Sequence, residues 1–256
     1  MTQPVIMEIL GIDIGGTGIK GAIVDTATGA MLTERYRMLT PHPVTPKNVL
    51  KGVQAMVDRH HWAGPIGIGF PGLIIEGVVR AGNNLEPSWI GVEVEDFFSK
   101  SLDVPVYVAN DADVAGYAEA LLDPEIADYT KVIFLTLGTG VGSALIYKGQ
   151  LVPGTELGSL YFKGDILERY ISNKVRKESE LSWSEYGKRL RKGLKYINTI
   201  LSPDRIIIGG GISKKMHKYE SFLTLPVPVT PAKLQNTAGT LGAALFAATR
   251  IKLTVK

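Results

Sequence analysis

The sequence predicts an α/β protein of two lobes with a central cleft. Two stretches of the chain, far apart in sequence, repeat one plan of a strand, a glycine-rich turn and a returning strand. The first is 9–24, with its turn at Gly15-Gly16-Thr17-Gly18, and the second is 133–147, with its turn at Gly138-Thr139-Gly140. Repetition of this kind indicates a duplicated architecture. No proline-rich or low-complexity linker divides the chain, which favours two lobes of one unit over tethered domains.

The composition excludes several classes of protein. The chain has 256 residues, of which 45% are hydrophobic and 21% charged, and these values are ordinary for a folded soluble protein. It has no cysteine, so disulfides and thiolate metal sites are excluded. No apolar run is long enough to cross a bilayer, and a net charge of +3 is not typical of a nucleic-acid-binding protein. We therefore expect a cytoplasmic protein with no membrane or nucleic-acid partner and no structural zinc.

The elements of the first lobe, expected at 1–112, follow from apolar spacing. After the first hairpin, a helix is expected at 48–60 because its apolar residues recur at helical intervals. Short apolar runs at 66–70 and 104–109 predict strands. The pair Asn110-Asp111 then precedes a helical segment, 113–122.

The second lobe, expected at 113–237, contains the second hairpin and the clearest helix. Ser182 and Glu185 form the pattern of a capping box, and apolar residues then recur every three or four positions over 183–201. A buried-type strand at 205–208 leads to Gly209-Gly210-Gly211. An alanine-rich helix at 238–250 closes the pattern, capped by Asn236 or Thr237, and we expect it to pack back on the first lobe.

Both glycine-rich turns have the composition of a phosphate cradle. A dinucleotide fingerprint or a P-loop needs a helix directly after its glycines, whereas strand-forming residues follow these turns. Glycines let backbone N–H groups converge on an anion that approaches closely. The candidate phosphate-binding residues are Gly15, Gly16, Thr17, Gly18, Lys20, Gly138, Thr139 and Gly140. Asp13 is a candidate magnesium ligand acting through water, and a plain hairpin turn is the alternative for each motif.

Carboxylates and amides outside the hairpins are candidate groups for an acceptor. Asp111 follows an apolar strand at a helix start, a common position for a catalytic base, although Asn and Asp there are also preferred helix caps. Amide groups at Asn83-Asn84 suit sugar hydroxyls, with turn formation as the alternative. Glu156 in a glycine-rich loop and Glu168 have surface-exposed acids as their alternative.

Basic residues are concentrated in the last third of the chain. A row of Lys and Arg beside a phosphate site would suit a long polyanion, and a solvated helix surface is the alternative. The candidate track comprises Lys174, Arg176, Lys177, Lys188, Arg191, Lys192, Lys195, Lys214 and Lys215.

The motifs resemble those of the ROK (repressor, open reading frame, kinase) branch of the sugar-kinase/actin superfamily. The segments 11–17 with Lys20, 137–143 and 209–213 are similar to its two phosphate motifs and to its nucleotide-proximal segment, and the likeness runs from about Leu10 to Ala248. Within the family, 151–158, 174–177 and 211–215 look like the polyphosphate glucokinases. The resemblance implies two ribonuclease-H-like lobes, a site in the cleft and a homodimer.

The resemblance also implies site residues. Asp111 matches the catalytic base, and Gly210 and Gly211 match glycines near the donor. The sugar ligands would be Asn84, Asn110, Asp111, Glu156 and Glu168. Ser159 stands where the family has a histidine, which places the choice of sugar in question.

The function implied is phosphoryl transfer from inorganic polyphosphate, and also from ATP, to the 6-hydroxyl group of glucose or a related hexose, with magnesium. One alternative is a strictly ATP-dependent hexose kinase. Others are a non-catalytic sugar-sensing protein and a transcriptional regulator. ROK repressors carry a DNA-binding domain before the first hairpin, and too few residues precede Asp13 for us to expect one.

Overall fold

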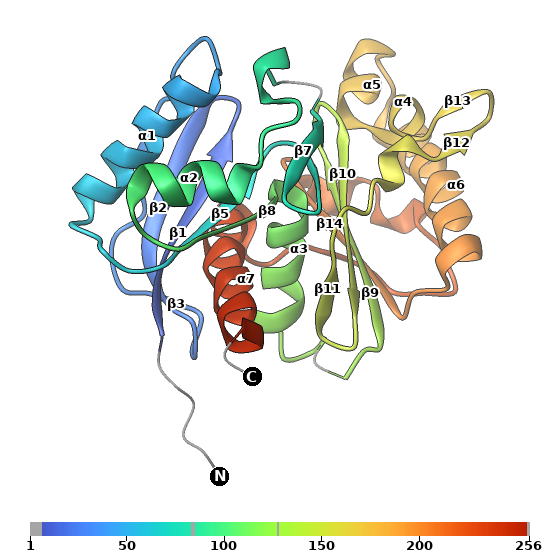
Figure 1. The fold of residues 1–256 in the computed structure, drawn as a ribbon. Coiled ribbons are helices and arrows are strands. Elements are labelled where there is room, and N and C mark those ends of the chain that lie inside the picture. The colour runs from blue at the N-terminus through green and yellow to red at the C-terminus, as the bar shows by residue number, and fades with distance from the viewer. Residues whose placement is uncertain (1–6, 83–84, 127, 255–256) are drawn as a thin grey trace. The chain divides into compact units, whose positions relative to one another are not determined.

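The computed structural model describes residues 7–82, 85–126 and 128–254 (Figure 1). The chain divides into two compact units: unit 1 comprises Met1–Ala118 and Asn236–Lys256, and unit 2 comprises Glu119–Gln235. The division lies within helix α3 (Asp111–Leu122), whereas the sequence analysis placed it after residue 112. Unit 2 is thus inserted between the two segments of unit 1.

Unit 1 is built on a mixed sheet with the strand order β3-β2-β1-β5-β8, and β4 also pairs with β2. Its first two strands form an antiparallel hairpin, while β1, β5 and β8 run parallel. A separate antiparallel pair is formed by β6 and β7. The strands are β1 (Glu8–Gly15), β2 (Gly18–Asp25), β3 (Ala30–Met31), β4 (Tyr36–Met38), β5 (Ile66–Phe70), β6 (Leu73–Ile75), β7 (Val78–Ala81) and β8 (Val106–Asn110).

Helices cover both faces of this sheet. On one face, α1 (Pro46–Arg59) and α2 (Val94–Leu102) share a hydrophobic core with alternate residues of β1 and β5. Successive positions of a strand face opposite sides of the sheet, so Gly67, between the core residues Ile66 and Ile68, faces the other side. On that side lies α7 (Ala238–Thr254). A Cβ atom on Gly67 would lie 1.9 Å from the backbone oxygen of Ala243 in α7. Only glycine permits so close an approach of strand and helix.

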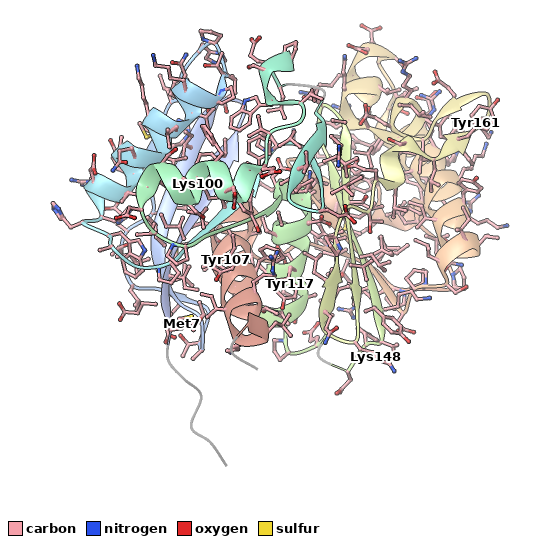
Figure 2. The ribbon with its side chains drawn as sticks, in the orientation of Figure 1. Met7, Lys100, Tyr107, Tyr117, Lys148 and Tyr161 are labelled. Atoms are coloured by element: carbon pink, nitrogen blue, oxygen red, sulfur yellow. The ribbon has the colours of Figure 1, made fainter. Side chains whose placement is uncertain are left out.

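Further contacts fix α7 to unit 1. Tyr117, labelled in Figure 2, belongs to α3, and its hydroxyl group lies 2.9 Å from the hydroxyl of Thr249 in α7. Arg250 forms an ion pair with Glu95 of α2 at 3.3 Å. The last helix therefore packs on the first sheet and extends to Thr254, beyond the end expected at 250.

Unit 2 repeats the plan of unit 1. Its sheet has the order β11-β10-β9-β14-β15, with an antiparallel hairpin of β9 and β10 and parallel pairing of β9, β14 and β15. The strands are β9 (Lys131–Leu137), β10 (Val141–Tyr147), β11 (Gln150–Val152), β14 (Arg205–Gly209) and β15 (Val229–Pro231). Order and direction match those of unit 1, so the expected duplicated α/β architecture is confirmed.

Helix α6 (Trp183–Leu201) begins and ends where the sequence predicts, and its capping box is formed. Leu190, Leu194 and Ile197 pack with β9 and β14 in the core of unit 2. Shorter elements not expected from the sequence are β12 (Tyr161–Phe162), β13 (Asp165–Ile166), α4 (Glu168–Ile171), α5 (Asn173–Glu178) and 3-10 helices at Pro87–Trp89, Leu157–Ser159, Ser213–Lys218, Glu220–Phe222 and Gln235–Thr237. In the part of the chain that the structure describes, no helix has the length and apolar character needed to span a membrane.

Candidate functional site

The first glycine hairpin carries an ion pair directly below its turn. Asp13 of β1 faces Lys20 of β2, and Lys20 Nζ lies 2.7 Å from Asp13 Oδ2. A Cβ atom on Gly239 would lie 2.8 Å from Asp13 Cγ, so the carboxylate rests against the first turn of α7. The N-terminal end of a helix carries partial positive charge. The Asp13 carboxylate is thus held between a lysine and a helix N-terminus.

The turn itself is supported from the side and open at its tip. Thr40 Oγ1 donates to the Gly15 carbonyl at 2.5 Å, and Arg37 Nη2 donates to the Thr17 carbonyl at 3.1 Å. The sequence analysis missed both supporting residues. A Cβ atom on Gly16 would meet nothing within 4 Å, and Gly16 does not have a positive φ. The fold therefore does not require glycine at 16, whereas close approach of an anion does.

Asp111 lies at the same edge of the sheet as Asp13. In the strand register, Gly69 of β5 is paired with Asp13 on one side and with Ala109 of β8 on the other. A Cβ atom on Gly69 would lie 3.6 Å from Asp111 Cα. The carboxyl ends of parallel strands are where α/β proteins place ligands. The structure thus brings the predicted base and the predicted magnesium ligand to one edge of the sheet of unit 1.

Asn110 makes the contacts of a helix cap. Its Oδ1 accepts hydrogen bonds from the backbone N–H groups of Ala112 at 2.8 Å and Asp113 at 3.2 Å, and its Nδ2 donates to the Gly72 carbonyl at 3.1 Å. The capping alternative therefore holds for Asn110, while its role as a sugar ligand stays a prediction. Asp111 is half-buried and opens α3. Asn84, with its neighbour Asn83, lies outside the described residues.

The second hairpin is contacted by two short helices of unit 2. Glu168 of α4 accepts a hydrogen bond through Oε2 from the Val141 N–H at 2.8 Å. The Lys174 N–H at the start of α5 donates to the Gly138 carbonyl at 3.1 Å. Thr139 is exposed, and a Cβ atom on Gly138 would meet nothing within 4 Å. This hairpin therefore has the open tip of the first one, with a carboxylate and a basic helix beside it.

Glu156 and Glu168 interact electrostatically within unit 2. The pKa of Glu156 is raised above its ordinary value, first by partial burial of its carboxylate and then by the nearby negative charge of Glu168. Ser143 of β10 accepts the N–H of Leu157 at 2.9 Å and hydrogen-bonds to the Thr155 carbonyl, which fixes the loop carrying Glu156. Two acids expected to bind a sugar are thus placed near one another and beside the second hairpin.

The segment after β14 adjoins the second hairpin as well. Gly210 has φ +77°, and a Cβ atom there would lie 3.1 Å from the backbone nitrogen of Leu137. Ser213 Oγ donates to the Gly210 carbonyl at 2.8 Å and holds this bend. A Cβ atom on Gly211 would meet nothing within 4 Å. A side chain at 211 would therefore meet no other atom, as at Gly16 and Gly138, so the fold does not require glycine there.

Basic residues from two segments converge on Trp183 at the start of α6. The guanidinium carbon of Arg176 lies 4.4 Å from the ring centre, and Lys215 Nζ and Lys218 Nζ lie at 6.0 and 5.8 Å. Cations are attracted to the face of an indole ring, and Trp183 itself stacks on Tyr219. The sequence analysis did not place Lys218 or Trp183 in the track.

The remaining residues of the predicted track are spread over exposed surface. Lys188, Arg191, Lys192 and Lys195 all lie on the exposed face of α6. Lys177 and Lys214 are also exposed, and Lys174 lies 3.9 Å from Glu178 in an ion pair. These basic side chains of unit 2 are thus exposed on α5, on α6 and in the segment after β14, and Lys174 is the one whose backbone N–H is described in contact with the second hairpin.

A magnesium site would depend on Asp13 together with oxygens from the substrate. Among the described residues, no three His, Cys, Asp or Glu side chains cluster as a metal site. Magnesium is commonly bound by only one or two carboxylates together with water and substrate phosphates. The single carboxylate of Asp13, next to a phosphate-type hairpin, fits this chemistry.

Two sheets of this order, each with a glycine-rich hairpin at its centre, define the two-lobed fold of the sugar kinases. The chain belongs to the ROK family, whose model matches residues 9–160.

Relatives support the same grouping. The chain is 41% identical over 236 residues to a polyphosphate glucokinase of Mycobacterium tuberculosis (strain CDC 1551 / Oshkosh), covering 92% of this chain and 89% of that protein. Its structure matches that of an inorganic polyphosphate/ATP-glucomannokinase from Arthrobacter sp. strain KM with a TM-score of 0.87 and 41% identity, over 95% of this chain and 99% of that one. A ROK family glucokinase from Streptomyces griseus, solved with glucose and AMPPNP, shares the fold at 22% identity, with a TM-score of 0.79 over 95% of this chain and 100% of that one.

Proposed function

We propose that this protein transfers the terminal phosphoryl group of inorganic polyphosphate to the 6-hydroxyl group of glucose or a related hexose, with ATP as a second donor. The observation that carries the proposal is that Gly16, Gly138 and Gly211 are glycines the fold does not require. Each lies in a segment expected to contact phosphate, where a bare backbone lets N–H groups reach an anion. The named activities of the two relatives at 41% identity support the same donor and acceptor.

Asp111 is the proposed general base. It accepts the proton of the sugar hydroxyl as the oxygen attacks the terminal phosphorus, so that the nucleophile gains charge only as the new bond forms. Its position at the carboxyl edge of the sheet, where α3 begins, supports this role. The proposed sugar ligands are Asn84, Asn110, Glu156 and Glu168, with Asp111 itself.

The two hairpins are proposed to hold the donor. Their backbone N–H groups, the hydroxyls of Thr17 and Thr139 and the ammonium group of Lys20 would stabilise charge on the phosphate oxygens. Asp13 would hold magnesium through water, and Lys20, now paired with Asp13, would be shared with the phosphate. When bound, the metal supplies positive charge that neutralises phosphate oxygens.

The cations around Trp183 favour polyphosphate over a nucleotide as donor. Polyphosphate carries negative charge along its whole length, and its attraction to a basic surface extends beyond the reacting end. Arg176 and Lys174 belong to α5, which contacts the second hairpin through the Lys174 N–H. Phosphates of a donor bound at this hairpin would lie beside the helix that carries these cations.

The test is a coupled assay of glucose 6-phosphate formation with magnesium, comparing long-chain polyphosphate with ATP. We expect turnover with both donors and a higher kcat/KM for polyphosphate. Turnover with ATP alone would refute polyphosphate as donor and leave a hexose kinase. No turnover with either donor, for glucose and then for other hexoses, would refute the catalytic proposal and favour a sugar-sensing protein.

A cytoplasmic location and a homodimer are part of the same proposal. They are supported by the family resemblance and by the ordinary soluble composition of the chain. Sedimentation of the purified protein distinguishes a dimer from a monomer.

A further inference from the structure

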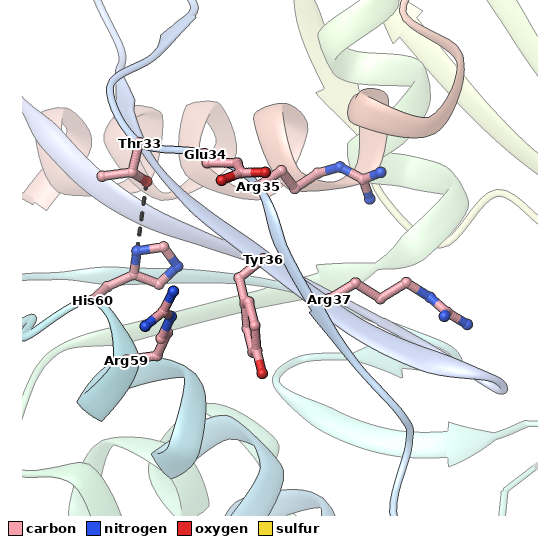
Figure 3. A pocket seen from close by; sticks show the side chains of 7 residues that line it. All are labelled: Thr33, Glu34, Arg35, Tyr36, Arg37, Arg59 and His60. Carbon is pink, nitrogen blue, oxygen red and sulfur yellow. Dashed lines mark hydrogen bonds between the residues drawn. The ribbon is translucent and has the colours of Figure 1, made fainter.

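Strand β4, at the edge of the first sheet, carries Arg37, and Arg35 directly precedes the strand; the proposed function uses neither arginine. β4 pairs with β2, so that Arg37 lies opposite Lys20 and Tyr36 opposite Gly21. Figure 3 shows Arg35 and Arg37 extending to one side of the chain and Tyr36 pointing another way, as alternation along an extended segment requires. Across neighbouring strands, Arg37 therefore continues the row that begins with Asp13 and Lys20, and Arg35 lies on the same side two positions earlier in the chain.

Arg37 lies against the turn of the first hairpin. Its Nη2 donates to the Thr17 carbonyl at 3.1 Å, and a Cβ atom on Gly18 would lie 2.8 Å from its Nε. A guanidinium group has five N–H donors in a fixed fork, so one hydrogen bond to the turn leaves donors for a phosphate oxygen. Arg37 is exposed, and its charge reaches the same turn that is proposed to hold a phosphate.

Arg35 carries a donor that the protein leaves unsatisfied. Its Nη1 is buried and has no hydrogen-bond partner among the described residues. None of the ion pairs found in the described part of the chain involves Arg35, Arg37 or Arg59. A buried donor without an acceptor is costly, and a guanidinium group that turned toward an anion in the pocket would lose that cost.

A pocket of about 370 Å³ lies beside this strand (Figure 3). Its lining is rich in positive charge, and Glu34 is its single acid. Arg59, at the end of α1, packs over the ring of Tyr36 at 5.1 Å. Burial lowers the pKa of His60, so at neutral pH the arginines carry the charge of the pocket. The lining residues are Thr33, Glu34, Arg35, Tyr36, Arg37, Arg59 and His60.

We infer that β4 and this pocket bind an internal segment of a linear polyphosphate chain whose end lies at the first hairpin. The inference rests on the proposed function and assigns it a second donor-binding surface, on unit 1. Alternate residues of an extended strand lie about 7 Å apart, which sets the two guanidinium groups in a row. A row suits a long chain of phosphates, whereas a nucleoside triphosphate has only three and ends in an uncharged sugar and base.

The test compares Arg35→Gln/Arg37→Gln with the matched variant Lys47→Gln/Lys51→Gln. Both remove two positive charges from unit 1, and Lys47 and Lys51 are exposed on α1. Calorimetric titration without glucose measures the affinity for tripolyphosphate and for long-chain polyphosphate. We expect the arginine variant to lose about tenfold in affinity for the long polymer and much less for tripolyphosphate. The lysine variant should bind both ligands as the unaltered protein does.

Three results would overturn the inference: equal losses in both variants, equal losses for both ligands in the arginine variant, or no loss at all. Thermal unfolding checks that Arg35→Gln/Arg37→Gln is folded, and Arg37→Gln alone, at an exposed position, provides a second variant if it is not. The KM for ATP should change little, and a rise as large as that for polyphosphate would also contradict the extended row. Polyphosphate binding that depends on the arginines, without sugar phosphorylation, would refute the proposed function and leave this inference standing.

Discussion

The two sheets have the same strand order and differ at the ends of corresponding strands. In unit 1 the last parallel strand, β8, is followed directly by Asp111, whereas in unit 2 the corresponding strand, β15, ends at Pro231 and is followed by Ala232. The proposed base therefore has no counterpart in unit 2. One architecture, used twice, supplies two glycine hairpins, while the proposed base lies at a strand end of unit 1 alone.

The hairpins differ in charge as well. The first has the ion pair of Asp13 and Lys20 between its strands, while the second pairs Leu137 with Val141 and Thr136 with Gly142. Negative charge reaches the second hairpin from outside it, through Glu168 of α4. Under the proposed function, the first hairpin would combine metal and phosphate binding, and the second would provide backbone donors beside the proposed sugar ligands.

A third difference concerns what packs on the sheet. The central parallel strand of unit 1, β5, carries Gly67 and Gly69, whereas its counterpart β14 carries Ile206, Ile207 and Ile208. Gly67 lets α7 contact the first sheet backbone to backbone, while Ile206 and Ile208 fill the core beside the second sheet with side chains. In unit 1, therefore, close backbone contact at Gly67, and not bulky side chains on β5, packs the sheet against α7.

The largest expected effect is the loss of turnover on replacing Asp111, the strand-end carboxylate of unit 1 that has no counterpart in unit 2. Asp111→Asn should lower kcat at least about 100-fold, because an amide cannot accept the hydroxyl proton. Steady-state kinetics with polyphosphate and glucose provide the measurement. Asp103→Asn is the matched control, since Asp103 is exposed and its left-handed conformation also suits asparagine. Near-normal turnover of Asp111→Asn would show that the carboxylate of Asp111 is not the general base.

The next effect is on stability in unit 1. Gly67→Ala should lower the free energy of unfolding by about 3 kcal/mol, because the new methyl group meets the Ala243 carbonyl of a helix that cannot shift alone. Urea unfolding followed by circular dichroism measures the loss. In unit 2, Gly209→Ala should cost less, since the group it meets is the Phe134 ring, which can rotate away. Equal costs would remove the distinction between the two sheets.

The smallest effect separates ligand-binding glycines from structural ones. Gly16→Ala and Gly138→Ala should each raise the KM for the donor about tenfold, because a methyl group keeps phosphate away from the backbone donors. Their urea midpoints should stay at that of the unaltered protein, since neither methyl group meets another atom. Unchanged KM values in both variants would show that the hairpins are plain turns that do not bind the donor.

Much of the fold was predictable because it depends on local patterns. The hairpins and α6 depend on runs of neighbouring residues, and the capping box of Ser182 and Glu185 marks the start of α6 within four positions. The position of Asp111, directly after a strand and at a helix start, was also predictable, and its role as a base stays a prediction. Helix α3 begins at Asp111, two residues before its expected start at 113, because the side chain of Asn110 caps it there.

The contacts within the candidate site were less predictable because they depend on register and tertiary packing. Asp13 and Lys20 were assigned separate ligands, and only the pairing of β1 with β2 shows that they face one another. Arg37 reaches the hairpin through β4, a strand of three residues that carries almost no periodic signal. Trp183 gathers cations from segments more than thirty positions apart, which no local pattern indicates.

The insertion of unit 2 into unit 1 has a consequence for biosynthesis. The ribosome releases β1, β5 and β8 long before α7, and every residue of unit 2 emerges in the interval. Unit 2 is continuous and can fold as soon as it is complete, whereas the nascent first sheet must wait with its glycine-lined face uncovered. Chains that stop before Ala238 would keep that face open, so unit 1 is complete only once α7 has emerged and packed on the sheet.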